Sequence, residues 1–148
     1  VQSMLSEAAV NPAGLCLEIT ESVFLTDPEV AQSRLEALRK LGVGIAIDDF
    51  GTGYSSMSYL KRLPVTELKI DQSFVAGLPE DEADIALVNI IVAAAQQLKL
   101  RVVAEGVENE RQADFLCGLG ELLFQGYYFD KPADVADWMK RWGEGSSG

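Results

Sequence analysis

The chain has 148 residues, a length that suits one domain. Its 12 basic and 23 acidic residues give a formal net charge of −11, which argues against a broad basic surface for DNA. Histidine is absent, and this excludes Ser-His-Asp and Cys-His nucleophiles as well as His-containing metal sites. A metal ion would need oxygen ligands, which favours magnesium, manganese or calcium.

The cysteines and the longest apolar stretch indicate a cytoplasmic, globular protein. Cys16 and Cys117 lie far apart without a CxxC motif, so we expect two reduced thiols in the core. Residues 85–98 are largely apolar, but polar side chains interrupt them, and the stretch is shorter than the roughly 20 residues of a membrane span. We therefore expect a buried amphipathic helix there and no membrane contact. Residues 143–148 are rich in glycine and serine and are expected to form a flexible tail.

Strand-like and helix-like segments alternate along the chain. After a helical segment at residues 1–9, strands are predicted at residues 15–20, 43–48, 67–70, 101–105 and 122–125. Helices are predicted at residues 26–41, 58–62, 81–98, 109–117 and 133–142, the first with a capping box from Thr26 to Glu29. This alternation predicts an α/β fold in which crossover helices join parallel strands. Two architectures satisfy it, an open doubly wound sheet and part of a TIM-type (βα)8 barrel, and the usual nucleotide-binding motifs of the open sheets are absent.

Each predicted strand carries a polar side chain near its carboxyl end. Because side chains alternate along a strand, one face can pack on helices while the other delivers these polar groups. In a closed barrel they would meet at the C-terminal mouth, where barrel enzymes have their active sites. The set consists of Glu18, Asp48, Asp49, Lys69, Glu105 and Gln125.

Carboxylates gathered in one cleft repel each other, and a divalent cation would remove that conflict. Lys69 could stabilise negative charge that develops on a phosphoryl group, or hold the attacking water. Structural roles are also open: Glu18 could be an exposed charge on an edge strand, and Lys69 could pair with Asp48 or Glu105. Asp48 could end a strand and cap a loop, and Glu105 could cap the next helix. The same placement recurs on four consecutive strands, which favours a site.

The aspartates run into a glycine-rich loop. Its members Phe50, Gly51, Thr52 and Gly53 come directly after Asp49. Glycine permits positive φ and a close approach to a ligand, although it could equally serve a tight turn. Directly after two aspartates at a strand end, the loop is interpreted as part of a site.

Five motifs resemble the EAL domain family in their residues, order and spacing. They are Leu17-Glu18-Ile19-Thr20-Glu21-Ser22, Asp48-Asp49-Phe50-Gly51-Thr52-Gly53-Tyr54-Ser55-Ser56, Leu68-Lys69-Ile70-Asp71, Ala104-Glu105-Gly106-Val107-Glu108, and Gln125-Gly126-Tyr127 with Lys131-Pro132. The resemblance implies a TIM-type barrel that hydrolyses cyclic di-GMP, a bacterial second messenger, to pGpG with magnesium or manganese, and that calcium inhibits. It further implies a homodimer formed through the EAL domain.

The resemblance also implies a role for each site residue. Metal ligands would be Glu18, Asp48, Asp49 and Glu105. Of these, Glu105 is the one that could also act as the general base. Lys69 would hold the attacking water, and Gln125 would help to hold a water or the metals.

Further residues would support the site. Glu21 would anchor the aspartate loop, and Glu108 would be a structural support near the metals. The loop of Phe50, Gly51, Thr52 and Gly53 would couple substrate, metals and dimerisation.

The chain differs from the family pattern in the N-terminal part of the domain. The family's Glu-Ala-Leu segment and the asparagine of its next inner strand are not in these residues, and Glu36-Ala37-Leu38 lies mid-helix between two matched motifs. Because a (βα)8 domain needs roughly 250 residues, we expect roughly 100 to be missing before Val1. Residues 1–142 are thus expected to be a partial EAL domain, an incomplete barrel of about five βα units.

Three functions follow from these observations. The first is the phosphodiesterase, with the isolated fragment weakly active or inactive because two metal ligands are missing. The second is a catalytically inactive module that binds cyclic di-GMP or another protein. The third, an open-sheet receiver domain with a magnesium site, is disfavoured because its acidic residues follow a different order along the chain.

Overall fold

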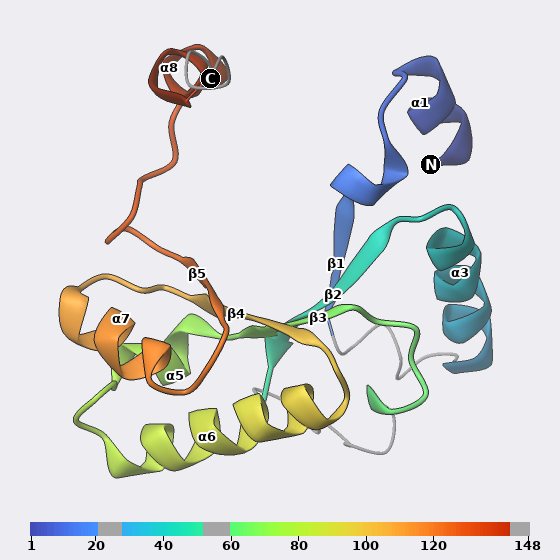
Figure 1. Cartoon of the computed structure of the whole chain (residues 1–148). Helices are drawn as coiled ribbons and strands as arrows, with labels where there is room; N and C mark the ends of the chain where they lie inside the picture. Colours follow the sequence, from blue (N-terminus) through green and yellow to red (C-terminus); the bar gives the residue numbers. More distant parts are fainter. Residues whose placement is uncertain (21–27, 52–59, 143–148) are drawn as a thin grey trace.

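The computed structural model describes residues 1–20, 28–51 and 60–142. Its centre is one sheet of five parallel strands, in which the spatial order equals the sequence order (Figure 1). The strands are β1 (Cys16–Thr20), β2 (Gly44–Phe50), β3 (Glu67–Ile70), β4 (Arg101–Glu105) and β5 (Leu123–Gln125). A doubly wound sheet reverses its strand order at a switch point, whereas consecutive order is that of a barrel. The sheet therefore has the topology of a barrel segment, as predicted.

Helices precede, connect and follow these strands. They are α1 (Gln2–Glu7), the 3-10 turn η1 (Pro12–Gly14), α3 (Pro28–Lys40), α5 (Gln72–Ala76), α6 (Glu82–Gln97), α7 (Glu110–Cys117) and α8 (Val135–Trp142). Among the residues that the structure describes, every helix is too short or too polar to cross a lipid bilayer. The predicted N-cap Thr26, residues 58–59 of the helix predicted at 58–62, and the tail at 143–148 lie outside the described residues, whereas residues 61–62 form a turn.

Side-chain capping fixes the starts of α6 and α7. The carboxylate of Asp81 accepts hydrogen bonds from the amides of Ala83 and Asp84 at 2.8 and 3.1 Å. Asn109 and Gln112 form a reciprocal capping box at the start of α7. Both helices therefore begin within one residue of the predicted position.

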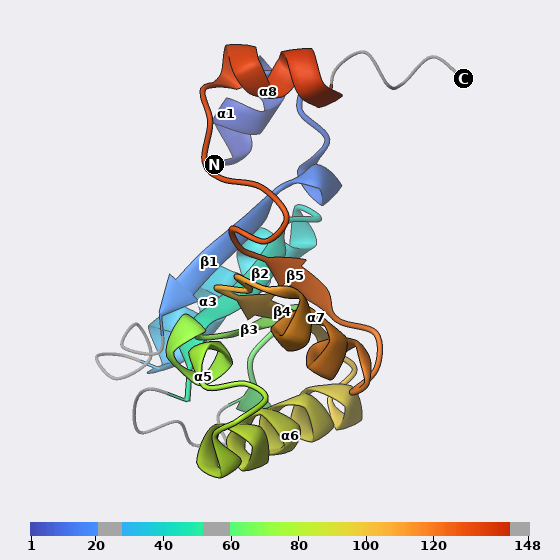
Figure 2. The same ribbon diagram turned by 90° about the vertical axis from the view of Figure 1, so that its left-hand side faces the viewer.

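The core lies between the apolar face of the sheet and α6. Ile45 and Ile47 of β2 and Leu68 of β3 are buried in one cluster with Val88 and Ile91 of α6. Figures 1 and 2 show α6 running along the lower side of the sheet. The opposite face carries the polar side chains, because paired residues of parallel strands point to the same side. On that face Glu105 is paired with Gln125, and Thr20 with Asp48.

The prediction that both cysteines lie in the core is wrong. Cys16 and Cys117 are both free thiols, but both are exposed, and neither lies in the core. Cys16 belongs to the polar face of β1, where its Sγ lies 4.0 Å from Glu67 Oε1. Cys117 is the last residue of α7.

Two features of the fold were not predicted. The strand β2 runs on to Phe50, and its pairing with β3 shifts between Ile47 and Phe50. Asp49 lies in this irregularity with φ of 53°, in the left-handed region that aspartate tolerates better than most residues. Such a bulge re-aims the side chains that follow it. The short helix α5 was also missed, although Asp71 caps it.

Candidate functional site

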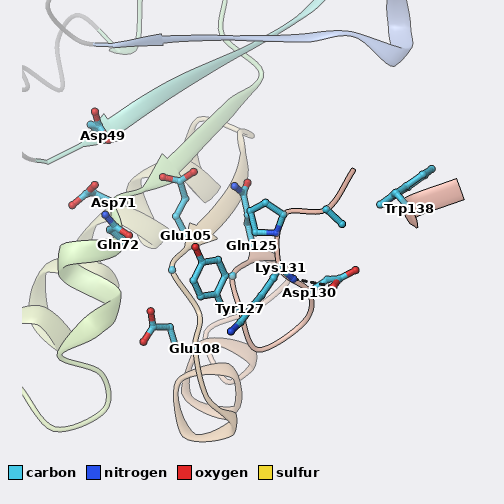
Figure 3. Close-up of a pocket in the computed structure, with 14 residues that line it drawn as sticks. Asp49, Asp71, Gln72, Glu105, Glu108, Gln125, Tyr127, Asp130, Lys131 and Trp138 are labelled. Atoms are coloured by element: carbon cyan, nitrogen blue, oxygen red, sulfur yellow. Dashed lines mark hydrogen bonds between the residues drawn. The ribbon is translucent and has the colours of Figure 1, made fainter. Parts of the chain in front are cut away.

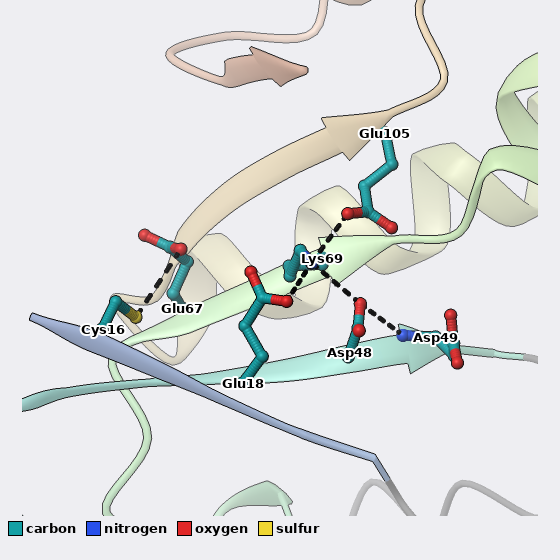
Figure 4. A network of polar contacts seen from close by, with 7 residues as sticks. All are labelled: Cys16, Glu18, Asp48, Asp49, Glu67, Lys69 and Glu105. Carbon is teal, nitrogen blue, oxygen red and sulfur yellow. Dashed lines mark hydrogen bonds and ion pairs between the residues drawn. The ribbon is translucent and has the colours of Figure 1, made fainter. Parts of the chain in front are cut away.

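One buried lysine gathers three carboxylates at the carboxyl end of the sheet. The Nζ atom of Lys69 lies 2.8 Å from Glu18, 3.0 Å from Asp48 and 2.7 Å from Glu105. The Lys69 side chain is only 5 % exposed, and the three carboxylates reach it from β1, β2 and β4 (Figure 4). Strand alternation predicted that these four residues would converge, and the structure brings them together. The ion pairs of Lys69 with Asp48 and Glu105 also match the structural alternative.

The lysine stays charged in these surroundings. Burial alone would lower the pKa of Lys69, but hydrogen bonds to Glu105, Glu18 and Asp48 outweigh it, and the pKa lies above its ordinary value of 10.5. Burial raises the pKa of Glu105, and the hydrogen bond and charge of Lys69 only partly offset this effect. The site thus holds one fixed positive charge among carboxylates that compete for it.

A second grouping of carboxylates is suited to a metal ion. Asp48, Asp49 and Glu105 each offer one oxygen, and these oxygens all lie within 4.8 Å of one another. Consecutive residues of a regular strand point to opposite faces, so the bulge at Asp49 is what allows both aspartates to reach one place. Glu18, a predicted metal ligand, is not in this group, but its carboxylate lies 2.8 Å from Nζ of Lys69.

The helix α5 closes the site on one side. Its N-cap Asp71 accepts hydrogen bonds from the amide and the hydroxyl of Ser73, and the hydroxyl bond above all lowers the pKa of Asp71. Desolvation raises the pKa of Asp49, and the charges of Asp48 and Asp71 add to that rise. Acidic side chains therefore line the site from the end of β2 to the N-terminus of α5.

An open cavity of about 660 Å³ lies beside these groups (Figure 3). It is lined by Asp49, Asp71, Gln72, Glu105, Gly106, Glu108, Gln125, Gly126, Tyr127, Asp130, Lys131, Pro132, Ala133 and Trp138. The predicted residues Gln125 and Glu108 are among them. No site role was predicted for Tyr127 and Lys131. Their positions just after β5, at the same edge of the sheet, could have indicated one.

The predicted glycine-rich loop is only partly described. Phe50 is 3 % exposed and belongs to the core, and Gly51 has φ of 100° and faces the ring of Phe74. Glu21, Thr52 and Gly53, predicted to support or line the site, lie outside the described residues.

The comparisons with known proteins agree in one family. The model of the EAL domain matches residues 1–132. A bifunctional diguanylate cyclase/cyclic di-GMP phosphodiesterase of Pseudomonas aeruginosa, MucR, is 48 % identical over 132 residues, which are 89 % of this chain and 19 % of MucR.

Solved structures give the same result. The MucR phosphodiesterase in its c-di-GMP complex is 46 % identical with a TM-score of 0.88, over 93 % of this chain and 56 % of that one. The EAL domain of Mycobacterium smegmatis DcpA is 42 % identical with a TM-score of 0.90, over 99 % and 66 %. Klebsiella pneumoniae BlrP1, solved in a manganese/cy-diGMP complex, is 35 % identical with a TM-score of 0.81, over 88 % and 33 %.

The chain thus spans less than two thirds of MucR and of each of these solved chains, and its five strands are part of a TIM-type barrel. Because the family model covers residues 1–132 of 148, the chain belongs to the EAL domain family.

Proposed function

We propose that these residues form the acidic part of the active site of a phosphodiesterase that hydrolyses cyclic di-GMP to pGpG. The observation that carries the proposal is the convergence of three carboxylate oxygens within 4.8 Å beside the buried ammonium of Lys69. The name of MucR and its c-di-GMP complex support the choice of substrate.

The carboxylates fit a divalent cation. Asp48, Asp49 and Glu105 would hold it, since they supply only oxygen atoms, the ligands that magnesium and manganese prefer. Bound there, the cation would polarise a phosphoryl oxygen and acidify a water molecule. BlrP1 complexes with manganese and with calcium support this site. We expect magnesium or manganese to support turnover, and calcium to inhibit because it takes more ligands in a looser geometry.

The chain's own residues have separate roles in this proposal. Lys69 keeps its proton and therefore acts as a donor, which orients the attacking water or neutralises charge on the phosphoryl group. Glu105 is half-buried and lies 2.7 Å from Lys69, so it can accept a proton from a water that binds beside this ion pair. Gln125, paired with Glu105 across the sheet, can orient that water with its amide.

The number of metal ligands in these residues favours a second function. The 148 residues contain no Glu-Ala-Leu segment at a strand, so a polypeptide limited to them offers fewer metal ligands than the family pattern. Such a polypeptide is proposed to bind cyclic di-GMP without hydrolysing it, or to do so only slowly. The proposal also includes a homodimer formed through the EAL domain and a cytoplasmic site of action.

Titration calorimetry with cyclic di-GMP, with and without magnesium, separates these functions when it is followed by chromatography for pGpG. The 148-residue polypeptide is expected to give binding without product, and the full-length protein to give product. An Asp48→Asn variant should abolish product, while Asp114→Asn on the exposed face of α7 serves as the matched control. Product at family-typical rates from the polypeptide alone would overturn the distinction.

A further inference from the structure

A buried glutamine lies directly behind the loop that follows Glu105. Gln112, in the first turn of α7, is 4 % exposed, and its carboxamide is hydrogen-bonded at both ends. Its Oε1 accepts from the amide of Glu108 at 2.8 Å and from the amide of Asn109 at 3.3 Å. Its Nε2 donates to the carbonyl of Val75 at 3.1 Å. One side chain therefore joins α5, the loop after β4 and the start of α7.

Other contacts also hold the loop of residues 106–109 in place. Gly106 has φ of 68° and packs so closely on α5 that an added Cβ would lie 2.5 Å from the Cβ of Gln72. Val107 is completely buried, donates from its amide to Gln125 and accepts at its carbonyl from Tyr128. The loop is thus held on one side by the segment after β5 and on the other by Gln112.

These contacts connect the two strands that carry the site. Val75 belongs to α5, which begins two residues after β3, the strand of Lys69. Glu108 and Asn109 follow β4, which ends in Glu105. Because the Lys69–Glu105 ion pair at 2.7 Å spans the same two strands, a shift of α5 against the loop would change that distance.

We propose that Gln112 is a positioning residue for the phosphodiesterase reaction, which fixes the loop of residues 106–109 against α5 and so sets the place of Glu105 relative to Lys69. The inference rests on the proposed function. Gln112 acts through Glu108, Asn109 and Val75 and touches neither substrate nor metal in this role. Partners that hold a site residue in place commonly affect metal affinity or activity by about 10-fold to 100-fold.

Two variants of the full-length protein test the hydrogen bonds themselves. Gln112→Met keeps the length of the side chain but neither accepts nor donates, so kcat is expected to fall about tenfold or more while KM changes little. Gln112→Glu keeps the acceptor for Glu108 and Asn109 in the capping box, but its carboxylate cannot donate to the carbonyl of Val75, so the link to α5 is lost and kcat should fall as well. If Gln112→Met does not fold, Gln112→Asn, whose amide is too short to reach both sides, carries the same expectation.

The matched control is the other half of the same capping box. Asn109→Ala removes the side chain that accepts from the amide of Gln112 at 3.1 Å, but leaves the carboxamide contacts intact. It should weaken the helix while kcat stays close to the wild-type value. A readout without substrate is amide hydrogen exchange, which should speed up at Glu108 in Gln112→Met and not in Gln112→Glu.

The outcomes are distinguishable. Equal kcat in Gln112→Met and Asn109→Ala, or a Gln112→Glu variant as fast as the wild type, would overturn the positioning role while an active wild type leaves the proposed function in place. An inactive wild-type full-length protein would overturn the proposed function and this inference with it.

Discussion

At the scale of single residues, the site depends on the charge of Lys69. One ammonium lies within 3.0 Å of three carboxylates from three other strands, and it is almost completely buried. Removal of one partner from a buried ionic cluster leaves the others uncompensated, which is more costly than the loss of a surface pair. Lys69 therefore serves both the folded state and the proposed chemistry.

The variant Lys69→Met tests the proposed catalytic role of this lysine in the full-length protein. The methionine preserves most of the side-chain volume, but the site loses its donor, so kcat is expected to fall about 100-fold to 1,000-fold. Steady-state hydrolysis of cyclic di-GMP measures the effect, with Lys40→Met on the exposed face of α3 as the control. Retention of kcat in Lys69→Met would contradict the assigned role.

The raised pKa of Lys69 makes a prediction about stability and pH in the absence of metal. A group whose pKa is higher in the folded state stabilises the fold fully below its unfolded value of 10.5, and loses this contribution as the pH rises through the higher folded value. The difference in unfolding free energy between wild type and Lys69→Met should therefore stay constant from about pH 8 to about pH 10. Urea unfolding with a chelator present measures it; the difference should fall only above about pH 10.5, and a difference that stays constant there as well would show an ordinary pKa.

At the scale of elements, the strand pattern was predictable and the bulge was not. Alternation alone placed Glu18, Asp48, Lys69 and Glu105 on one face, and the structure brings these four together. Alternation cannot reveal an extra residue in a strand. Because a one-residue shift exchanges the faces, the bulge turns Asp49 to the site and Phe50 into the core.

The short helix α5 was missed because five residues are too few to show a helical period. Its N-cap was a readable signal, since Asp71 stands two residues before Ser73, whose amide and hydroxyl it accepts from. The cavity residues after β5 were missed for another reason. Their positions depend on how the chain leaves the strand, which strand periodicity does not determine.

The start of α6 gives a prediction about stability alone. Asp81→Ala removes the side-chain acceptor for the amides of Ala83 and Asp84 and should lower the free energy of unfolding by about 1 kcal/mol. Denaturant unfolding measures the loss, and Asp114→Ala on the exposed face of α7 is the comparison. Because α6 lies on the far side of the sheet from the site, kcat should not change, and a fall in kcat would contradict this separation.

Gly126 tests the close approach of the segment after β5 to the loop after β4. A Cβ at Gly126 would lie 2.1 Å from the carbonyl oxygen and 2.4 Å from the amide nitrogen of Val107, both backbone atoms. Gly126→Ala should therefore cost roughly 1–3 kcal/mol of unfolding free energy. Gly14→Ala, which meets no atom within 4 Å, should leave stability nearly unchanged, and equal effects of the two would contradict the packing described here.

At the scale of the whole molecule, a negatively charged protein is proposed to bind a substrate that is also negatively charged. The chain carries a net charge of −11, and a cyclic dinucleotide adds two phosphates. Divalent cations bound by Asp48, Asp49 and Glu105 would balance both. The alternation of strands and helices fits either an open sheet or a barrel. The resemblance to the EAL family predicted the barrel, and the consecutive strand order and the likeness to EAL structures confirm it.

The central claim is metal-dependent hydrolysis at this carboxylate site, and it is tested most directly by chromatography of cyclic di-GMP incubated with the full-length protein. We expect pGpG with manganese or magnesium, no product with a chelator, and no product from Asp48→Asn under any condition, while Asp114→Asn should behave as wild type. Undiminished product in the presence of chelator or from Asp48→Asn, or no product from the wild type with either metal, would contradict it.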